Sequence, residues 1–170
     1  ITQMQLGPVR FSVDAKTQAG RRPFEHRLVV RETAFRMASS EAAPGIQETY
    51  TALARDETRN QMILNDVIRA LENGRSPILL TERKELLEYF ATHLARVARH
   101  LVVLQGGMGA KAHRAVAAIP TSEERLVLAT GRYIGEGFDD ARLDTLFLAM
   151  PVSWKGTLVQ YTGRLHRLHP

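Results

Sequence analysis

Three side chains near the end of the chain have the types and spacing that phosphate chemistry requires. Gln160, Arg164 and Arg167 are separated by four and three residues, so in a helix they project from one face. Two guanidinium groups with an amide one turn away supply planar sets of donors that fit phosphate oxygens. The alternative is an ordinary amphipathic helix whose arginines favour the helix dipole at its C-terminal end.

Two earlier segments place polar and small residues directly after apolar runs that are typical of buried strands. Residues 77–81 read Pro-Ile-Leu-Leu-Thr and are followed by Glu82 and Arg83. Residues 126–131 read Leu-Val-Leu-Ala-Thr-Gly, and Gly-Glu-Gly-Phe-Asp follows at 135–139. In parallel α/β sheets, ligands bind beyond the carboxyl ends of the strands. Thr81 and Thr130 are therefore candidates for a ligand site.

These three segments, in this order, resemble motifs of the C-terminal RecA-like domain of superfamily-two DEAD/DEAH-type helicases. Residues 79–83 are similar to motif four, residues 129–139 to motif five and residues 160–167 to motif six. The resemblance covers about residues 76–167. The Glu-Gly-Phe-Asp form of motif five and the glutamine that begins motif six are more similar to the restriction-subunit-type bacterial branch than to DEAD-box RNA helicases.

The resemblance implies that this chain is the closing half of a two-domain motor. A separate N-terminal RecA-like domain would hold the cofactor ATP, its Mg2+ ion and the attacking water. This chain would supply Arg164 and Arg167 as catalytic arginine fingers, with Arg167 as the first candidate for the γ-phosphate. Asp139 would approach the nucleotide sugar, with a turn or helix cap as its alternative role. The implied nucleotide-binding residues are Gly135, Glu136, Gly137, Asp139 and Gln160.

A second part of the same sheet edge would bind the phosphate backbone of one nucleic-acid strand, either DNA or RNA. Thr hydroxyls and exposed backbone N–H groups at strand ends bind phosphates without reading sequence. For Thr81 and Arg83, the alternative is the start of a helix. The candidate residues are Thr81, Arg83, Gly106, Gly107, Thr130 and Gly131.

Helix and strand patterns alternate along most of the chain. Apolar residues at helical spacing predict helices in three regions. The first extends from Gln47 to a stop at Asn73-Gly74, and the others cover residues 82–100 and 111–119. In the second region, Val97 is expected on the inner face. Strand-type runs lie at 77–81, 101–105, 126–131 and 145–150. This alternation predicts an α/β fold, a three-layer RecA-like parallel sheet with helices on both faces.

The first 45 residues differ in composition from the rest. A strand-like run at 26–31 lies between loop-like stretches at 18–23 and 39–45. We expect residues 1–45 to be a short, strand-containing extension or linker from a preceding domain, and residues 46–170 to be the second RecA-like domain, truncated after motif six. The chain begins with Ile1 rather than Met, so we expect both ends to be boundaries of a longer protein.

Composition sets wider limits. A chain of 170 residues with 44% hydrophobic content has the size of one domain with a core. Its formal net charge is +5, and 19 of its 23 basic residues are arginine, which suits phosphate contacts and equally suits a GC-rich genome. The absence of cysteine excludes disulfides and thiolate metal sites. No apolar run approaches the roughly 18 residues of a membrane span, so we expect a cytoplasmic protein without a membrane partner.

Other functions find less support in the sequence. Residues 107–112 match the Gly-x-Gly-x-x-Ala form of a dinucleotide site, but a strand and a helix precede them, and no obvious acidic residue lies at the end of a strand about 20 residues on. No Walker A sequence and no Asp-Glu-x-His quartet occur. Asp140 and Asp144 are interpreted as turn or surface residues, and no metal site is expected. A RecA-like fold retained only as a docking module remains an alternative.

Overall fold

The computed structural model describes residues 27–37, 45–105, 114–130 and 140–151. The chain divides into two compact units, residues 1–32 and residues 33–170, and each is described by itself. The helices and strands described below all belong to the second unit. The domain boundary at residues 45 and 46 stays a prediction.

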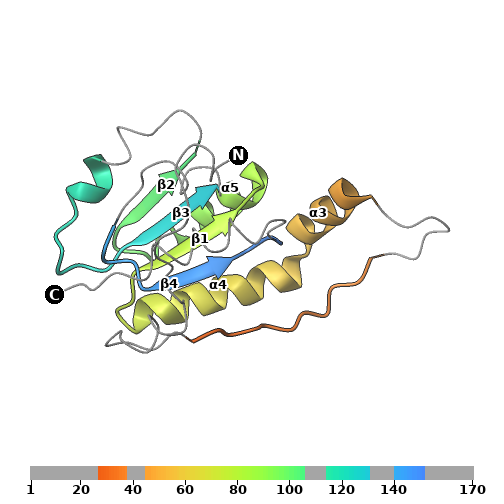
Figure 1. The fold of residues 1–170 in the computed structure, drawn as a ribbon, viewed down its shortest axis with the longest axis horizontal. Helices are drawn as coiled ribbons and strands as arrows, with labels where there is room; N and C mark the ends of the chain where they lie inside the picture. The colour runs from red at the N-terminus through yellow and green to blue at the C-terminus, as the bar shows by residue number, and fades with distance from the viewer. Residues whose placement is uncertain (1–26, 38–44, 106–113, 131–139, 152–170) are drawn as a thin grey trace, which may run out of the picture. The chain divides into compact units, whose positions relative to one another are not determined.

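A parallel sheet forms the centre of the second unit (Figure 1). Its strands are β1 (Pro77–Thr81), β2 (Leu101–Leu104), β3 (Leu126–Thr130) and β4 (Thr145–Leu148). Their order across the sheet is β2-β3-β1-β4, and every neighbouring pair is parallel. Strand β1 is buried throughout and β3 over all but its last residue, because they occupy the middle and are covered on both faces. This confirms the predicted α/β parallel-sheet fold.

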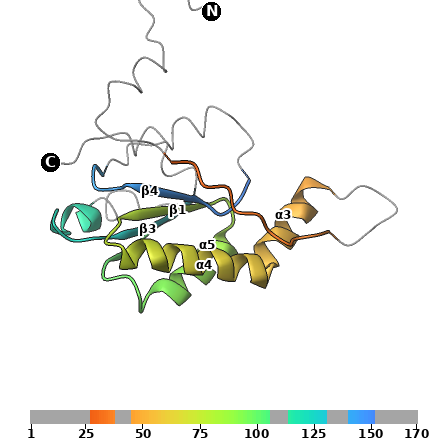
Figure 2. The same cartoon turned by 90° about the horizontal axis from the view of Figure 1, so that it is seen from below.

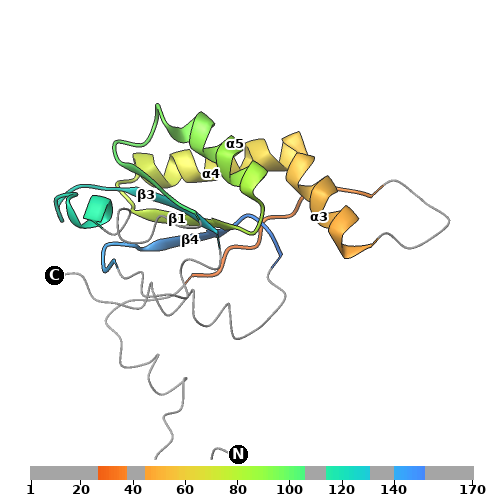
Figure 3. The same cartoon turned by 90° about the horizontal axis from the view of Figure 1, so that it is seen from above.

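Successive residues of the two middle strands enter two separate hydrophobic clusters, one on each face of the sheet. Leu79, Leu126 and Leu128 pack with residues of α4 (Glu57–Glu72) and α5 (Lys84–Leu94). Ile78, Leu80, Val127 and Ala129 pack on the other face, together with Val116 from the helical residues 114–117. Figures 2 and 3 show α4 and α5 together on one side of the sheet. The expectation of helices on both faces is met by this arrangement.

The single helical pattern that begins at Gln47 forms two helices, α3 (Ile46–Arg55) and α4. They separate at Asp56, whose backbone is extended and whose carboxylate accepts a hydrogen bond of 2.7 Å from the Arg59 N–H. This is an N-cap, in which a short acidic side chain replaces the preceding helical turn as acceptor. The Asn60 side chain donates to the Ala54 carbonyl at 2.9 Å, which satisfies one of the free carbonyls at the end of α3.

Helix α4 ends where the sequence predicts. Gly74 adopts a positive φ of 68°, a conformation that glycine reaches without steric cost. The Gly74 N–H donates to Leu71 and the Arg75 N–H donates to Ala70, which is the hydrogen-bond pattern of a Schellman helix end. The chain is thereby turned into β1.

Helix α5 is shorter than predicted. It ends at Leu94, and the Val97 and Ala98 N–H groups both donate to the Leu94 carbonyl in the turn that follows. Val97 is 44% exposed, so its expected place on the inner face was wrong. The reason is that apolar residues continue at helical spacing beyond residue 94 in the sequence, although the helix itself ends there.

The strand expected at 26–31 is also wrong for the residues that the structure describes. Residues 27–37 carry neither helix nor strand. Apolar residues such as Leu28 and Val30 favour a strand, but a strand requires a neighbour that pairs with its backbone groups. The four-stranded sheet does not include this segment.

None of the described helices is long and apolar enough to span a membrane.

Candidate nucleic-acid interface at the carboxyl edge of the sheet

Two threonines from segments far apart in the sequence lie side by side at the carboxyl edge of the sheet. Thr81 ends β1, Thr130 ends β3, and the two residues are register partners. Strand β2 ends beside them at Leu104, which pairs with Ala129. The parallel arrangement therefore brings the segments similar to motifs four and five to one edge, as expected from their positions after strands.

The Thr81 side chain has a local role at this edge. Thr81 is 2% exposed, and its hydroxyl oxygen accepts a hydrogen bond of 3.1 Å from the Arg83 N–H. Arg83 is the N-cap residue of α5, and its carbonyl accepts from the Leu87 N–H at 3.0 Å. The helix-start interpretation thus describes how Thr81 and Arg83 are placed. The turn leaves the Arg83 side chain at the carboxyl edge.

The Arg83 guanidinium is held by α3. Its Nη2 donates to the Gln47 side-chain oxygen at 2.8 Å and to the Gln47 carbonyl at 3.3 Å. Within the described residues, Nη1 and Nε of Arg83 make no hydrogen bond. These donors are not among the buried unpaired atoms, so they remain available to an acceptor such as a phosphate oxygen.

A second arginine, Arg59 of α4, contacts the chain just after the end of β4. The Arg59 Nη2 donates to the Ala149 carbonyl, and the Ala149 N–H donates to Leu80 at 2.8 Å. Burial lowers the pKa of Arg59 from its ordinary value, and the nearby Asp56 carboxylate opposes that shift. Arg59 thereby holds the carbonyl of the residue that directly follows β4.

Charged groups at the opposite, amino edge are paired with one another. Arg99 and His100 both contact Glu123, and the hydrogen bond with His100 is the main cause that lowers the pKa of this carboxyl. The buried Arg125 pairs with Asp140 at 3.3 Å. These contacts hold the loops that enter β2, β3 and β4.

The two aspartates interpreted as turn or surface residues make different contacts. Asp140 accepts from the Arg142 N–H two residues on, within a turn, whereas Asp144 accepts from the Ser76 N–H, 68 residues away in the sequence. The Asp140 side chain is only 8% exposed, so the surface part of that interpretation was wrong for this residue. Its pairing with the buried Arg125 is the physical reason. Within the described ranges, no group of three or more residues capable of holding a metal ion comes together.

Most of the site residues predicted from the sequence lie outside the described residues, and their roles stay predictions. Gln47 and Arg59, which the sequence analysis did not select, contact residues 36 and 90 positions away. No periodicity links such distant positions, although Asp56 before a helical run is a recognisable N-cap signal for the turn that carries Arg59. The predicted residues outside the described ranges are Gly106, Gly107, Gly131, Gly135, Glu136, Gly137, Asp139, Gln160, Arg164 and Arg167.

Comparison with known proteins supports the fold. The chain matches no family model and no curated protein. Among solved structures it is similar to the crystal structure of T4 UvsW, a helicase, with a TM-score of 0.60 and 13% sequence identity. The match covers 72% of this chain and 25% of T4 UvsW, so the chain spans about a quarter of that protein. The chain therefore has an α/β fold that resembles a helicase RecA-like domain.

Proposed function

We propose that the chain is the C-terminal motor domain of an ATP-dependent nucleic-acid helicase or translocase, of the restriction-subunit-like bacterial branch. It closes over ATP held by an N-terminal RecA-like domain of the same protein, which also holds Mg2+. Arg164 and Arg167 then stabilise charge on the γ-phosphoryl group, while the strand ends of β1, β2 and β3 bind the phosphate backbone of one DNA strand. The activity belongs to the two domains together.

One observation carries this proposal: Thr81 and Thr130 are register partners at the carboxyl edge of a sheet with a helicase-like fold. The segments similar to motifs four and five are 49 residues apart between these positions, and the strand order makes them neighbours. Arg83 follows on the same edge with two guanidinium nitrogens free of hydrogen bonds within the described residues. Such an edge binds phosphates through position and charge, without selecting bases.

The nucleotide side of the proposal rests on the sequence. In the sequence, the Gly-Glu-Gly-Phe-Asp stretch begins five residues after the end of β3, and residues 160–167 begin twelve residues after the end of β4. Arg59 holds the Ala149 carbonyl just after β4, in the part of the chain that precedes residues 160–167.

The 170-residue chain is expected to bind single-stranded DNA weakly, with little sequence preference and a steep dependence on salt. Neutralising about three phosphates lowers affinity by about 20-fold between roughly 50 and 200 mM salt, because bound counterions are released. Fluorescence anisotropy with labelled oligonucleotides of DNA and of RNA measures this. Tight, salt-insensitive binding to one sequence would show a specific recognition module instead.

Arg83→Ala tests the edge itself. We expect this change to weaken binding by about tenfold, the value of one charge-assisted hydrogen bond. Arg69→Ala is the matched control, because Arg69 is an exposed arginine in the last turn of α4, which leads to the amino end of β1. Equal losses from both changes would mean that only net charge matters.

The chain alone is expected to hydrolyse no ATP above background. It carries no Walker A sequence and no Asp-Glu-x-His quartet to hold the phosphates and Mg2+. A turnover assay with and without DNA checks this. Hydrolysis that is stimulated by DNA and follows the protein through purification would overturn the two-domain proposal.

A further inference from the structure

The contact between Gln47 and Arg83 joins two elements that the sequence does not connect. Gln47 lies in the first turn of α3, and Arg83 lies at the start of α5. A single guanidinium nitrogen, Nη2, donates to both oxygens of Gln47. The two oxygens of Gln47 thus restrict the position of Nη2. The other guanidinium nitrogens of Arg83, Nη1 and Nε, therefore keep a defined position relative to the carboxyl edge of the sheet.

Arg83 is held by the uncharged amide of Gln47 rather than by a carboxylate. Arg69, Arg99 and Arg125 each lie beside a carboxylate. For Arg83 the described part of the chain shows no ion pair. An amide oxygen can orient a guanidinium without cancelling its charge, whereas a carboxylate orients it and also neutralises it. The positive charge of Arg83 therefore stays available at the carboxyl edge.

We propose that Gln47 is a positioning residue that fixes the Arg83 guanidinium for a backbone phosphate of the bound nucleic-acid strand while preserving its charge. This inference rests on the proposed function and adds α3 to the interface. Pre-organising a flexible arginine removes part of the entropy cost of ordering its side chain when the strand binds. An amide at position 47 is the chemistry that provides order and charge together.

The decisive experiment compares Gln47→Glu with Gln47→Ala in the 170-residue chain. Gln47→Glu keeps an acceptor for Arg83 and adds an ion pair, so its melting temperature should equal or exceed that of the unchanged chain. Its affinity for single-stranded DNA should nevertheless fall by about tenfold, since the phosphate contact then competes with a carboxylate. Gln47→Ala should weaken binding by about threefold, because Arg83 keeps its charge and loses its order.

A double-mutant cycle and a control complete the design. In the Arg83→Ala background, Gln47→Ala should cause no further loss, because the two residues act through one contact. Gln61→Ala serves as the control, since Gln61 is an exposed glutamine on α4 that bonds only its neighbour Asn65 in the described residues. It should leave binding unchanged.

The outcomes separate the two proposals. If the unchanged chain binds no single strand, the proposed function fails and the role of Gln47 fails with it. If Arg83→Ala weakens binding while both Gln47 variants bind normally, the interface stands and the positioning role of Gln47 is overturned. Losses of binding in the Gln47 variants that merely follow their losses of thermal stability would also overturn it, because they would show a structural contact only.

Discussion

Replacing Arg167 by alanine in the two-domain protein is expected to lower ATP turnover by about 10³-fold or more. Nucleotide affinity should change far less, because an arginine finger acts mainly on charge that develops in the transition state. Arg167→Lys should restore little activity, since an ammonium group cannot reproduce the planar guanidinium fork. Steady-state ATPase kinetics at several ATP concentrations separate the effect on kcat from the effect on KM.

Two controls show whether a loss of turnover in the Arg167 variants comes from a loss of folding. A thermal melt of each variant should match that of the unchanged protein, and Arg69→Ala should leave turnover unchanged, because Arg69 is exposed and far along the chain from motif six. Near-normal turnover in Arg167→Ala, or loss of the folded state, would identify this arginine as a structural residue that favours its helix dipole.

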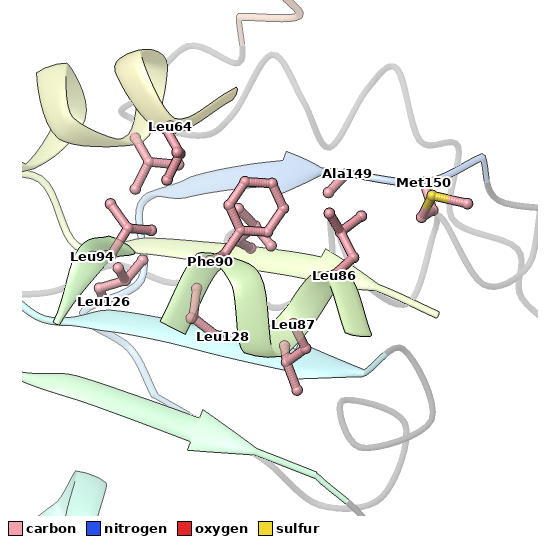
Figure 4. Packing of buried hydrophobic residues seen from close by; sticks show 11 residues of the cluster. Leu64, Leu86, Leu87, Phe90, Leu94, Leu126, Leu128, Ala149 and Met150 are labelled. Carbon is pink, nitrogen blue, oxygen red and sulfur yellow. The ribbon is translucent and has the colours of Figure 1, made fainter. Parts of the chain in front are cut away.

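Replacing Phe90 by alanine is expected to destabilise the chain by about 3–5 kcal/mol. Phe90 is 0% exposed and belongs to the cluster between the two main helices and the sheet. Figure 4 shows its ring between α5 and the strands, with Leu86, Leu94 and Leu128 around it. The change removes apolar contact and leaves a cavity that the rigid sheet cannot fill. Urea unfolding followed by circular dichroism measures the loss.

Val97→Ala is the matched comparison for Phe90. Val97 follows the end of α5 and is 44% exposed, so its truncation should change stability by less than about 0.5 kcal/mol. A loss below about 1 kcal/mol for Phe90→Ala would show that the packing on this face of the sheet is looser than the structure indicates.

The sequence predicted those parts of the fold in which local pattern and tertiary packing agree. The apolar runs at 77–81 and 126–131 became middle strands, because such runs are stable only when both faces are covered. The stop at Asn73-Gly74 followed from the conformational freedom of glycine. Periodicity failed at Asp56 and Val97, because apolar spacing continued through points where the backbone leaves the helix.

The site was predictable in part. Position after a strand placed Thr81 and Thr130 at the carboxyl edge, but their adjacency depends on β1 lying between β3 and β4. Strand order is a tertiary property that no local window contains. The partners Gln47 and Arg59 depend on the same packing, because each reaches a residue from another element of the fold.

The strand order also fixes when a growing chain is able to fold. β1 and β2 leave the ribosome first, yet they pair with each other nowhere, and both pair with β3. Until Val127 has been synthesised, Ile78 and Val102 lack the neighbour that their backbones bond. Pairing over such sequence distances is slow, and the apolar faces stay open to other chains meanwhile. We therefore expect a nascent chain that ends before β3 to expose the apolar strands β1 and β2 without the strand that joins them.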